Sequence, residues 1–235
     1  MNYIKETFLL DFNHTSIQKL VNQNDWRQLN DKQKIKNIYL FVRDEIKFGY
    51  NKADELKASI ILKDGIGQCN TKSTLLMALL RAVGIECRLH GFTIDKLLQK
   101  GAFTGMWYKL APQNILHTWV EVKYIDQWFN MEGVILDKEY LSKLQIKYKN
   151  HNLNFCGYGV YTDDLLNPIV DWDENNTYIQ KCGINQDFGL FDDPDSFYQK
   201  HQQTKSKLKQ FIFKKFVRQS NNKNVEKIRS GITLD

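Results

Sequence analysis

The strongest constraint on the fold is a glycine-containing turn that leads directly into the most apolar helix of the chain. The turn is Gly65-Ile66-Gly67-Gln68-Cys69, and a run of leucines follows it between residues 75 and 80. Gly84 is a natural C-cap for this helix. Because a helix this apolar must be buried, Cys69 is predicted at the first turn of a helix inside the core.

Length and composition are those of one large globular domain. The 235 residues are 42% hydrophobic and 26% charged, which allows a sizeable core. The longest apolar run, 75–80, is much shorter than the roughly 20 residues that span a bilayer, and residues 1–12 hold no signal-peptide core. We therefore expect a cytoplasmic protein without a membrane span. Its many Asn, Lys and Ile residues are typical of an AT-rich, bacterial genome.

Periodicity predicts a mixture of helices and strands. We expect helices over 15–29, over 30–48 with Asn30 as N-cap, and over 69–84, with a short helical or turn segment at 51–62. Strands are expected over 87–93, 117–124 and 127–134, the last two joined by the turn Ile125-Asp126. Residues 94–114 form a variable connection, and 135–200 have no clear pattern.

Cys69 has the setting that a nucleophilic cysteine needs. A helix N-terminus favours the thiolate, and the glycines before it allow a substrate to approach closely. The N–H of Cys69 can also point at an oxyanion. The other cysteines, Cys87, Cys156 and Cys182, are predicted to be free thiols and small core residues. No CxxC pair or zinc-site spacing is present, so we expect no metal and no cofactor.

His117 is the best candidate for a base among the five histidines, because it opens a strand and is followed on the same face by Trp119. If Ile125-Asp126 is the turn, the residue numbers of facing residues in the two strands sum to 251. Glu132 then lies on the same sheet face as His117, within reach of its imidazole. Asn130 shares that face and is the reserve partner. Asp137, beyond the hairpin, is the third choice. A slip of one residue would move Glu132 to the other face.

Several segments together resemble the transglutaminase-like superfamily, over about residues 31–141. The resemblance rests on Gly65-Ile66-Gly67-Gln68-Cys69, Lys72-Ser73-Thr74-Leu75-Leu76, Leu80-Arg81-Ala82-Val83-Gly84-Ile85, Arg88, His117-Thr118-Trp119-Val120-Glu121-Val122, Trp128 and Glu132. It implies an α+β, papain-like fold, in which a central helix carrying the cysteine packs on an antiparallel sheet.

By this resemblance, Cys69 matches the nucleophile and His117 the general base. Glu132 stands where the family usually has aspartate, four residues after the tryptophan matched by Trp128, so the third role departs from the family pattern. Gln68, Trp107 and Trp119 are candidate substrate-binding residues.

The predicted activity is cysteine-dependent acyl transfer or hydrolysis of an amide, through a thioester, on a peptide or protein substrate. The sequence does not decide between water and an amine as acceptor. One alternative is acyl transfer from a thioester to an amine, as in arylamine acetyltransferases. Another is a binding or regulatory module that kept the fold without turnover. A classical papain-type protease is less favoured, because His117 follows Cys69 by only 48 residues.

Charge is concentrated at the C-terminus. Residues 200–235 hold ten Lys and Arg against Glu226 and Asp235, whereas 160–195 is acidic. No nucleic-acid motif accompanies the basic charge, so nucleic-acid binding is not favoured. We expect a catalytic domain over 1–199 and a basic helical segment over 200–235. The apolar residues of that segment, between 208 and 217, are expected to pack on the body beside the acidic stretch.

Overall fold

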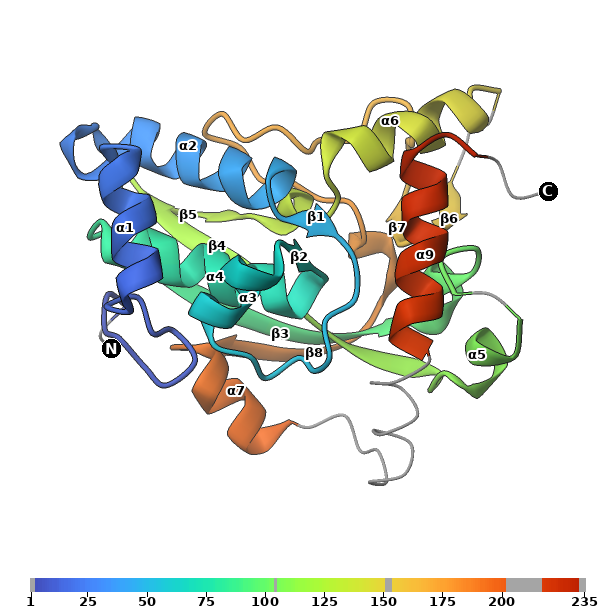
Figure 1. Cartoon of the computed structure of the whole chain (residues 1–235), viewed down its shortest axis with the longest axis horizontal. Coiled ribbons are helices and arrows are strands. Elements are labelled where there is room, and N and C mark those ends of the chain that lie inside the picture. The colour runs from blue at the N-terminus through green and yellow to red at the C-terminus, as the bar shows by residue number, and fades with distance from the viewer. Residues whose placement is uncertain (1–2, 104, 151–153, 202–216, 233–235) are drawn as a thin grey trace.

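A four-stranded antiparallel sheet and one buried helix form the centre of the molecule (Figure 1). The structure is a computed structural model that describes residues 3–103, 105–150, 154–201 and 217–232. The helices are α1 (Thr15–Gln23), η1 (Trp26–Gln28), α2 (Asp31–Asp44), α3 (Ala58–Asp64), α4 (Cys69–Ala82), η2 (Lys96–Gln99), α5 (Gly105–Leu110), η3 (Glu132–Val134), α6 (Lys138–Lys147), η4 (Lys181–Gly183), α7 (Pro194–Lys200) and α9 (Arg218–Arg229). The strands are β1 (Lys47–Phe48), β2 (Ile66–Gly67), β3 (Cys87–Asp95), β4 (Asn114–Tyr124), β5 (Gln127–Asn130), β6 (Phe155–Gly157), β7 (Val160–Thr162) and β8 (Ile184–Phe191).

The sheet has the strand order β5-β4-β3-β8, and every neighbouring pair is antiparallel. β1 and β2 form a short parallel pair, and β6 and β7 an antiparallel pair. The fold is therefore α+β, as predicted. No helix among the described residues is long and apolar enough to cross a membrane.

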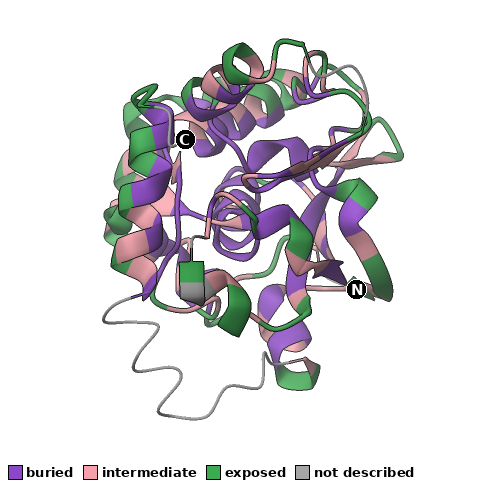
Figure 2. Cartoon of the chain, turned by 90° about the vertical axis from the view of Figure 1, so that its right-hand side faces the viewer, coloured by how far each residue is buried: buried purple, intermediate pink, exposed green. Residues whose placement is uncertain are grey.

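Helix α4 is enclosed on all sides. Every residue from Cys69 to Arg81 is buried, because the sheet strands β3 and β4 contact one side of the helix and α1, α2 and α3 contact the other. Figure 2 looks at the molecule along this helix, which lies in the middle surrounded by other chain segments. The prediction of a central buried helix that begins at Cys69 is confirmed.

The β4–β5 hairpin has the predicted register. Tyr124 pairs with Gln127 and Glu121 with Asn130. Ile125 and Asp126 both have positive φ, 44° and 58°, which is typical of a two-residue type I′ turn. The predicted strand over 127–134 is too long, since β5 ends at Asn130 and the chain then turns into η3.

The predicted helix after Asn30 is also confirmed. Asn30 caps α2 and forms a capping box with Gln33. The helix predicted over 15–29 is instead α1 followed by the single turn η1. Of the three cysteines expected in the core, only Cys87 is buried, while Cys156 is half-buried and Cys182 is exposed; all are free.

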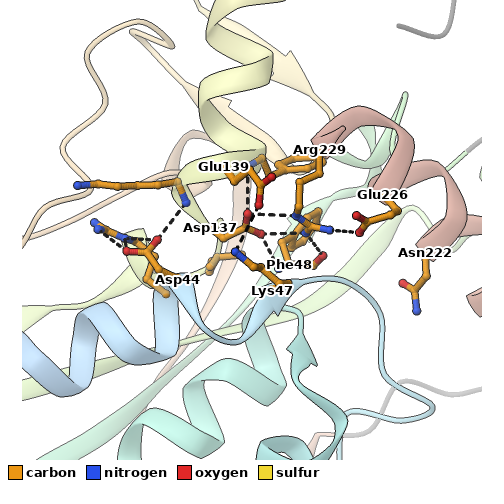
Figure 3. A network of polar contacts seen from close by, with 12 residues as sticks. Asp44, Lys47, Phe48, Asp137, Glu139, Asn222, Glu226 and Arg229 are labelled. Atoms are coloured by element: carbon orange, nitrogen blue, oxygen red, sulfur yellow. Dashed lines mark hydrogen bonds and ion pairs between the residues drawn. The ribbon is translucent and has the colours of Figure 1, made fainter. Parts of the chain in front are cut away.

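The acidic stretch 160–195 does not pair with the described part of the basic segment. Its carboxylates bind cations elsewhere: Asp171 binds Arg43 and Lys138, Asp173 and Glu174 bind Lys32, and Asp187 binds His90. Helix α9 packs instead on α6. Its Arg229 forms an ion pair with Asp137 at 2.9 Å (Figure 3). Residues 208–216 of the predicted apolar stripe lie outside the described residues.

Candidate active site

Cys69 is the first residue of α4, at the end of the turn predicted to precede it. Gly65 ends α3 with a φ of +64°, and Gln68 is the extended N-cap of α4. A Cβ on Gly67 would lie 2.7 Å from Cγ of Lys72, so glycine is needed for this close approach. Because Cys69 opens the helix, its N–H has no acceptor within the helix.

The thiol of Cys69 lies among apolar and aromatic side chains. It belongs to a buried cluster with Phe48 and Tyr50, and 8% of the residue remains exposed. Its Sγ donates to Oδ1 of Asn70, at 3.7 Å. The nucleophile candidate is therefore enclosed, and only a small part of the residue is exposed.

Asn70 fixes the start of α4 on strand β4. Its Nδ2 donates to the carbonyl of Leu116 at 3.1 Å, and its Oδ1 accepts from Oγ1 of Thr118 at 3.2 Å. These two residues flank His117 in the sequence. The position of Cys69 relative to His117 is thus held by a buried side chain that sequence reasoning missed, although it directly follows Cys69.

The imidazole of His117 is fully buried and interacts with both Cys69 and Glu132. Its Nε2 donates to Oε1 of Glu132 at 2.8 Å. Its Nδ1 makes no hydrogen bond of standard geometry to the described residues, so this nitrogen is free to serve Cys69. Burial lowers the pKa of His117, but the charge and side-chain interaction of Cys69 and the hydrogen bond to Glu132 outweigh it and raise the pKa to about 10.

Glu132 lies in the turn η3, directly beyond the end of the hairpin, and is fully buried. While Oε1 faces His117, Oε2 accepts three backbone N–H groups, from Ile179 (2.9 Å), Gln180 (3.0 Å) and Lys181 (3.0 Å). Three such donors fix the carboxylate and stabilise its negative charge. These donors come from the part of the sequence that had no interpretable pattern.

The two other candidate partners of His117 lie elsewhere. Asn130 donates to the hydroxyl of Tyr178 at 2.8 Å and to Oδ1 of Asn176 at 3.1 Å. Asp137 caps α6 and accepts from the N–H of Phe48 and from Arg229 (Figure 3). Glu132 is the residue that the structure places against His117.

The predicted substrate-binding residues have different surroundings. The side chain of Gln68 is held within the fold, because Oε1 accepts from the N–H of Asn51 and Nε2 donates to Asp54. Trp119 packs on Phe92, with ring centroids 4.1 Å apart, and lies edge-on to His117 at 6.1 Å. The backbone of Trp107 lies in α5, and its side chain is outside what the structure describes.

The remaining thiols and the metal-ligating side chains offer no competing site within the described residues. Burial raises the pKa of the Cys87 thiol to about 11 and that of Cys156 to about 11, and it also raises the pKa of Cys182. In the described part of the chain, no three His, Cys, Asp or Glu side chains are grouped to hold a metal ion. Among the four cysteines, Cys69 is therefore the candidate nucleophile.

A central helix that begins at a cysteine and packs on an antiparallel sheet with a histidine defines the papain-like class of cysteine enzymes. Within this class the family follows from comparison with known families. Residues 18–133 match the transglutaminase-like superfamily, and this part of the chain belongs to it. The match confirms the resemblance seen in the sequence motifs, and it includes Cys69, His117 and Glu132.

Among solved structures, the chain is similar to the crystal structure of a "Putative Cysteine Protease" from Cytophaga hutchinsonii, with 13% sequence identity and a TM-score of 0.46. The alignment covers 83% of this chain and 47% of that chain, so this chain spans about half the length of that structure. No curated protein matches the sequence.

Proposed function

We propose that the protein transfers the acyl group of an amide, in a peptide or protein, to Cys69 and then to water or an amine. The observation that supports this most directly is the buried series Cys69, His117 and Glu132, in which His117 lies between the sulfur and a fixed carboxylate. Raising the pKa of His117 favours the imidazolium, and an imidazolium favours the thiolate of Cys69.

In the first half of the reaction, the Cys69 thiolate attacks the amide carbonyl carbon and a C–S bond forms. The carbonyl electrons move onto oxygen, and the N–H of Cys69 donates to this oxyanion. The C–N bond then breaks, and His117 gives the proton on Nδ1 to the leaving amine. Nδ1 has this role because Nε2 is committed to Glu132.

In the second half, water or an amine attacks the thioester carbon. His117 takes the proton of the attacking group on Nδ1, the C–S bond breaks, and the thiolate is restored. Water gives an acid and an amine gives a new amide. Access of water to the site is limited because Tyr50, Trp119 and His117 are all buried. A site that excludes water favours amine acceptors.

Trapping the acyl-enzyme tests this proposal. We expect an activated acyl donor such as p-nitrophenyl acetate to add an acetyl mass to the peptide containing Cys69, and hydroxylamine to remove it. Cys69→Ala should abolish the adduct, and His117→Ala should slow its formation. His90→Ala is the matched control, because His90 also forms hydrogen bonds with carboxylates, those of Glu121 and Asp187, but is not part of the series Cys69, His117 and Glu132. A protein that forms no adduct at Cys69 would be a binding module.

A further inference from the structure

The side chain of Lys72 is fully buried, one helical turn after Cys69. Its Nζ donates to the carbonyl of Arg43 at 2.9 Å and to the carbonyl of Ile135 at 3.0 Å. Arg43 lies in the last turn of α2, and Ile135 is the C-cap of η3, the turn that begins with Glu132. One ammonium therefore joins the cysteine helix to two other segments.

Packing alone does not explain a lysine here, because burying an ammonium is costly and an apolar side chain of the same length would avoid that cost. What the amino group of Lys72 can do, and an apolar side chain cannot, is donate hydrogen bonds. Both acceptors lie at the ends of helical segments, where carbonyl groups lack partners within the helix and carry partial negative charge. We therefore infer the role of Lys72 from its hydrogen bonds to the carbonyls of Arg43 and Ile135.

The charged groups around Lys72 are already paired with each other. Asp137 binds Arg229 and Asp44 binds Arg43, each at 2.9 Å, and Figure 3 shows Asp44, Asp137 and Arg229 in one network. Within the described residues, Lys72 itself has no ion pair within 4 Å. Its bonds to the backbone are therefore its specific contribution.

Asn70 and Lys72 together attach α4 to the two segments that carry His117 and Glu132. Asn70 ties the start of α4 to strand β4 on both sides of His117. Lys72, two residues later, ties the same helix to the turn of Glu132. The helix that carries Cys69 is thus fixed separately to the segments that carry His117 and Glu132.

We propose that Lys72 is a positioning residue of the acyl-transfer site, which holds the turn of Glu132 against α4 so that the carboxylate stays on His117. The consequence for turnover rests on the proposed function. The placement itself does not, because the hydrogen bond between His117 and Glu132 can be observed in the resting protein.

The test compares Lys72→Met, which keeps the chain length but removes the donors, with Arg81→Met. Arg81 is the matched control, because it is also a buried cation of α4 and also donates to backbone carbonyls, those of Lys5, Cys87 and Asp192. It lies at the other end of the helix from Cys69. Nitrogen-15-labelled histidine in the full chain allows the Nε2–H proton of His117 to be followed by NMR.

In the unmodified protein we expect a downfield Nε2–H signal that Glu132→Gln shifts and thereby assigns. Lys72→Met should fold, as judged by circular dichroism, but lose or broaden this signal. Its acyl-enzyme formation should be about 100-fold slower, the scale of a misplaced catalytic group. Arg81→Met should melt at a lower temperature but keep the signal and the rate.

The proposal is overturned if Lys72→Met keeps the His117 signal while losing as much stability as Arg81→Met, because Lys72 would then be a structural residue only. If Lys72→Met does not fold, Lys72→Gln is measured in its place. It keeps an N–H donor on a shorter side chain, and loss or retention of the His117 Nε2–H signal decides the question in the same way. If the unmodified protein shows the His117 signal but forms no acyl-enzyme, the proposed function fails, while the signal still tests Lys72.

Discussion

Glu132 accepts a hydrogen bond from His117 at 2.8 Å through one carboxylate oxygen, while the other oxygen accepts the backbone N–H groups of residues 179–181. The turn η3 begins beyond the end of β5, so the side chain must reach both the neighbouring strand and a separate loop. The longer arm of glutamate, at a position where the family usually has aspartate, does this here. The departure from the family pattern thus has a structural counterpart in the 179–181 loop.

The first prediction concerns this carboxylate. Glu132→Gln keeps the size of the side chain but places an NH₂ group against either the three backbone N–H donors or the Nε2–H of His117. We expect the free energy of unfolding to fall by about 3 kcal/mol, and acyl-enzyme formation to slow by about 10⁴-fold, as when an orienting carboxylate is lost.

Glu121→Gln is the control for that experiment. Glu121, in β4, is likewise a carboxylate that binds a histidine, His90, at 2.9 Å. Equal losses of activity in both variants would contradict a special role for Glu132. The rate is measured with the acyl donor, and the stability by urea unfolding.

The second prediction concerns the pH dependence of stability that Lys72 causes. Burial lowers the pKa of Lys72 to about 7 from its ordinary 10.5; Asp137 and Asp44 act against this effect, and Arg229 and Arg43 reinforce it. Between pH 7 and pH 10.5 the unfolded chain therefore binds more protons at this site than the folded chain.

The cost of burying the charged ammonium is thus fully present below pH 7 and is relieved as the pH rises. Urea unfolding at pH 6, 8 and 9.5 should show the unmodified protein gaining stability relative to Lys72→Met. A constant difference between the two proteins across this range would refute the prediction.

The third prediction concerns His90, whose contribution to stability falls as the pH rises. Burial lowers the pKa of His90, but its hydrogen bonds and charge interactions with Glu121 and Asp187 outweigh this and raise the pKa above 6.5. Its stabilising contribution is therefore fully present below pH 6.5 and is lost as the pH rises through the pKa of the folded state.

Since His90 is only half-buried, we expect a modest effect of about 1 kcal/mol. The free energy of unfolding of the unmodified protein should exceed that of His90→Gln at pH 6, and the difference should shrink at pH 9. A difference that grows with pH would show that the imidazole is not held charged by these carboxylates.

The fourth prediction concerns the attachment of α9. Arg229 is buried and donates to Asp137 and to the carbonyl of Phe48 (Figure 3). Arg229→Met leaves the fully buried carboxylate of Asp137 without its cation, which should cost about 3–5 kcal/mol in urea unfolding. Lys227→Met, at an exposed position of the same helix, should cost little. Similar losses in both variants would mean that the ion pair does not anchor the helix.

The sequence was informative where local chemistry decides the structure. The glycines before Cys69 and the leucines after it predicted the central helix, and Ile125-Asp126 predicted the register of the β4–β5 hairpin, which ends just before Glu132. Both features depend on residues close together in the chain, so spacing and period are sufficient.

The contacts that complete the site come from distant segments and could not be predicted in this way. The N–H groups of 179–181 that hold Glu132 carry no side-chain signal at all, because any residue other than proline supplies the same donor. The bond from Lys72 to Ile135 joins residues 63 positions apart. A lysine in an apolar helix was a visible irregularity, but its acceptors are backbone carbonyls that only the fold brings together.

The reactivity of the four thiols toward iodoacetamide at pH 5.5, with each site followed by mass spectrometry, measures whether His117 activates the sulfur of Cys69. We predict that Cys69 reacts at least about 100-fold faster than Cys182, although Cys182 is the more exposed. This advantage should disappear in His117→Ala and persist in His90→Ala. If all four cysteines react slowly and alike, or if His117→Ala leaves Cys69 as reactive as before, the sulfur is not activated by the imidazole and the account is wrong.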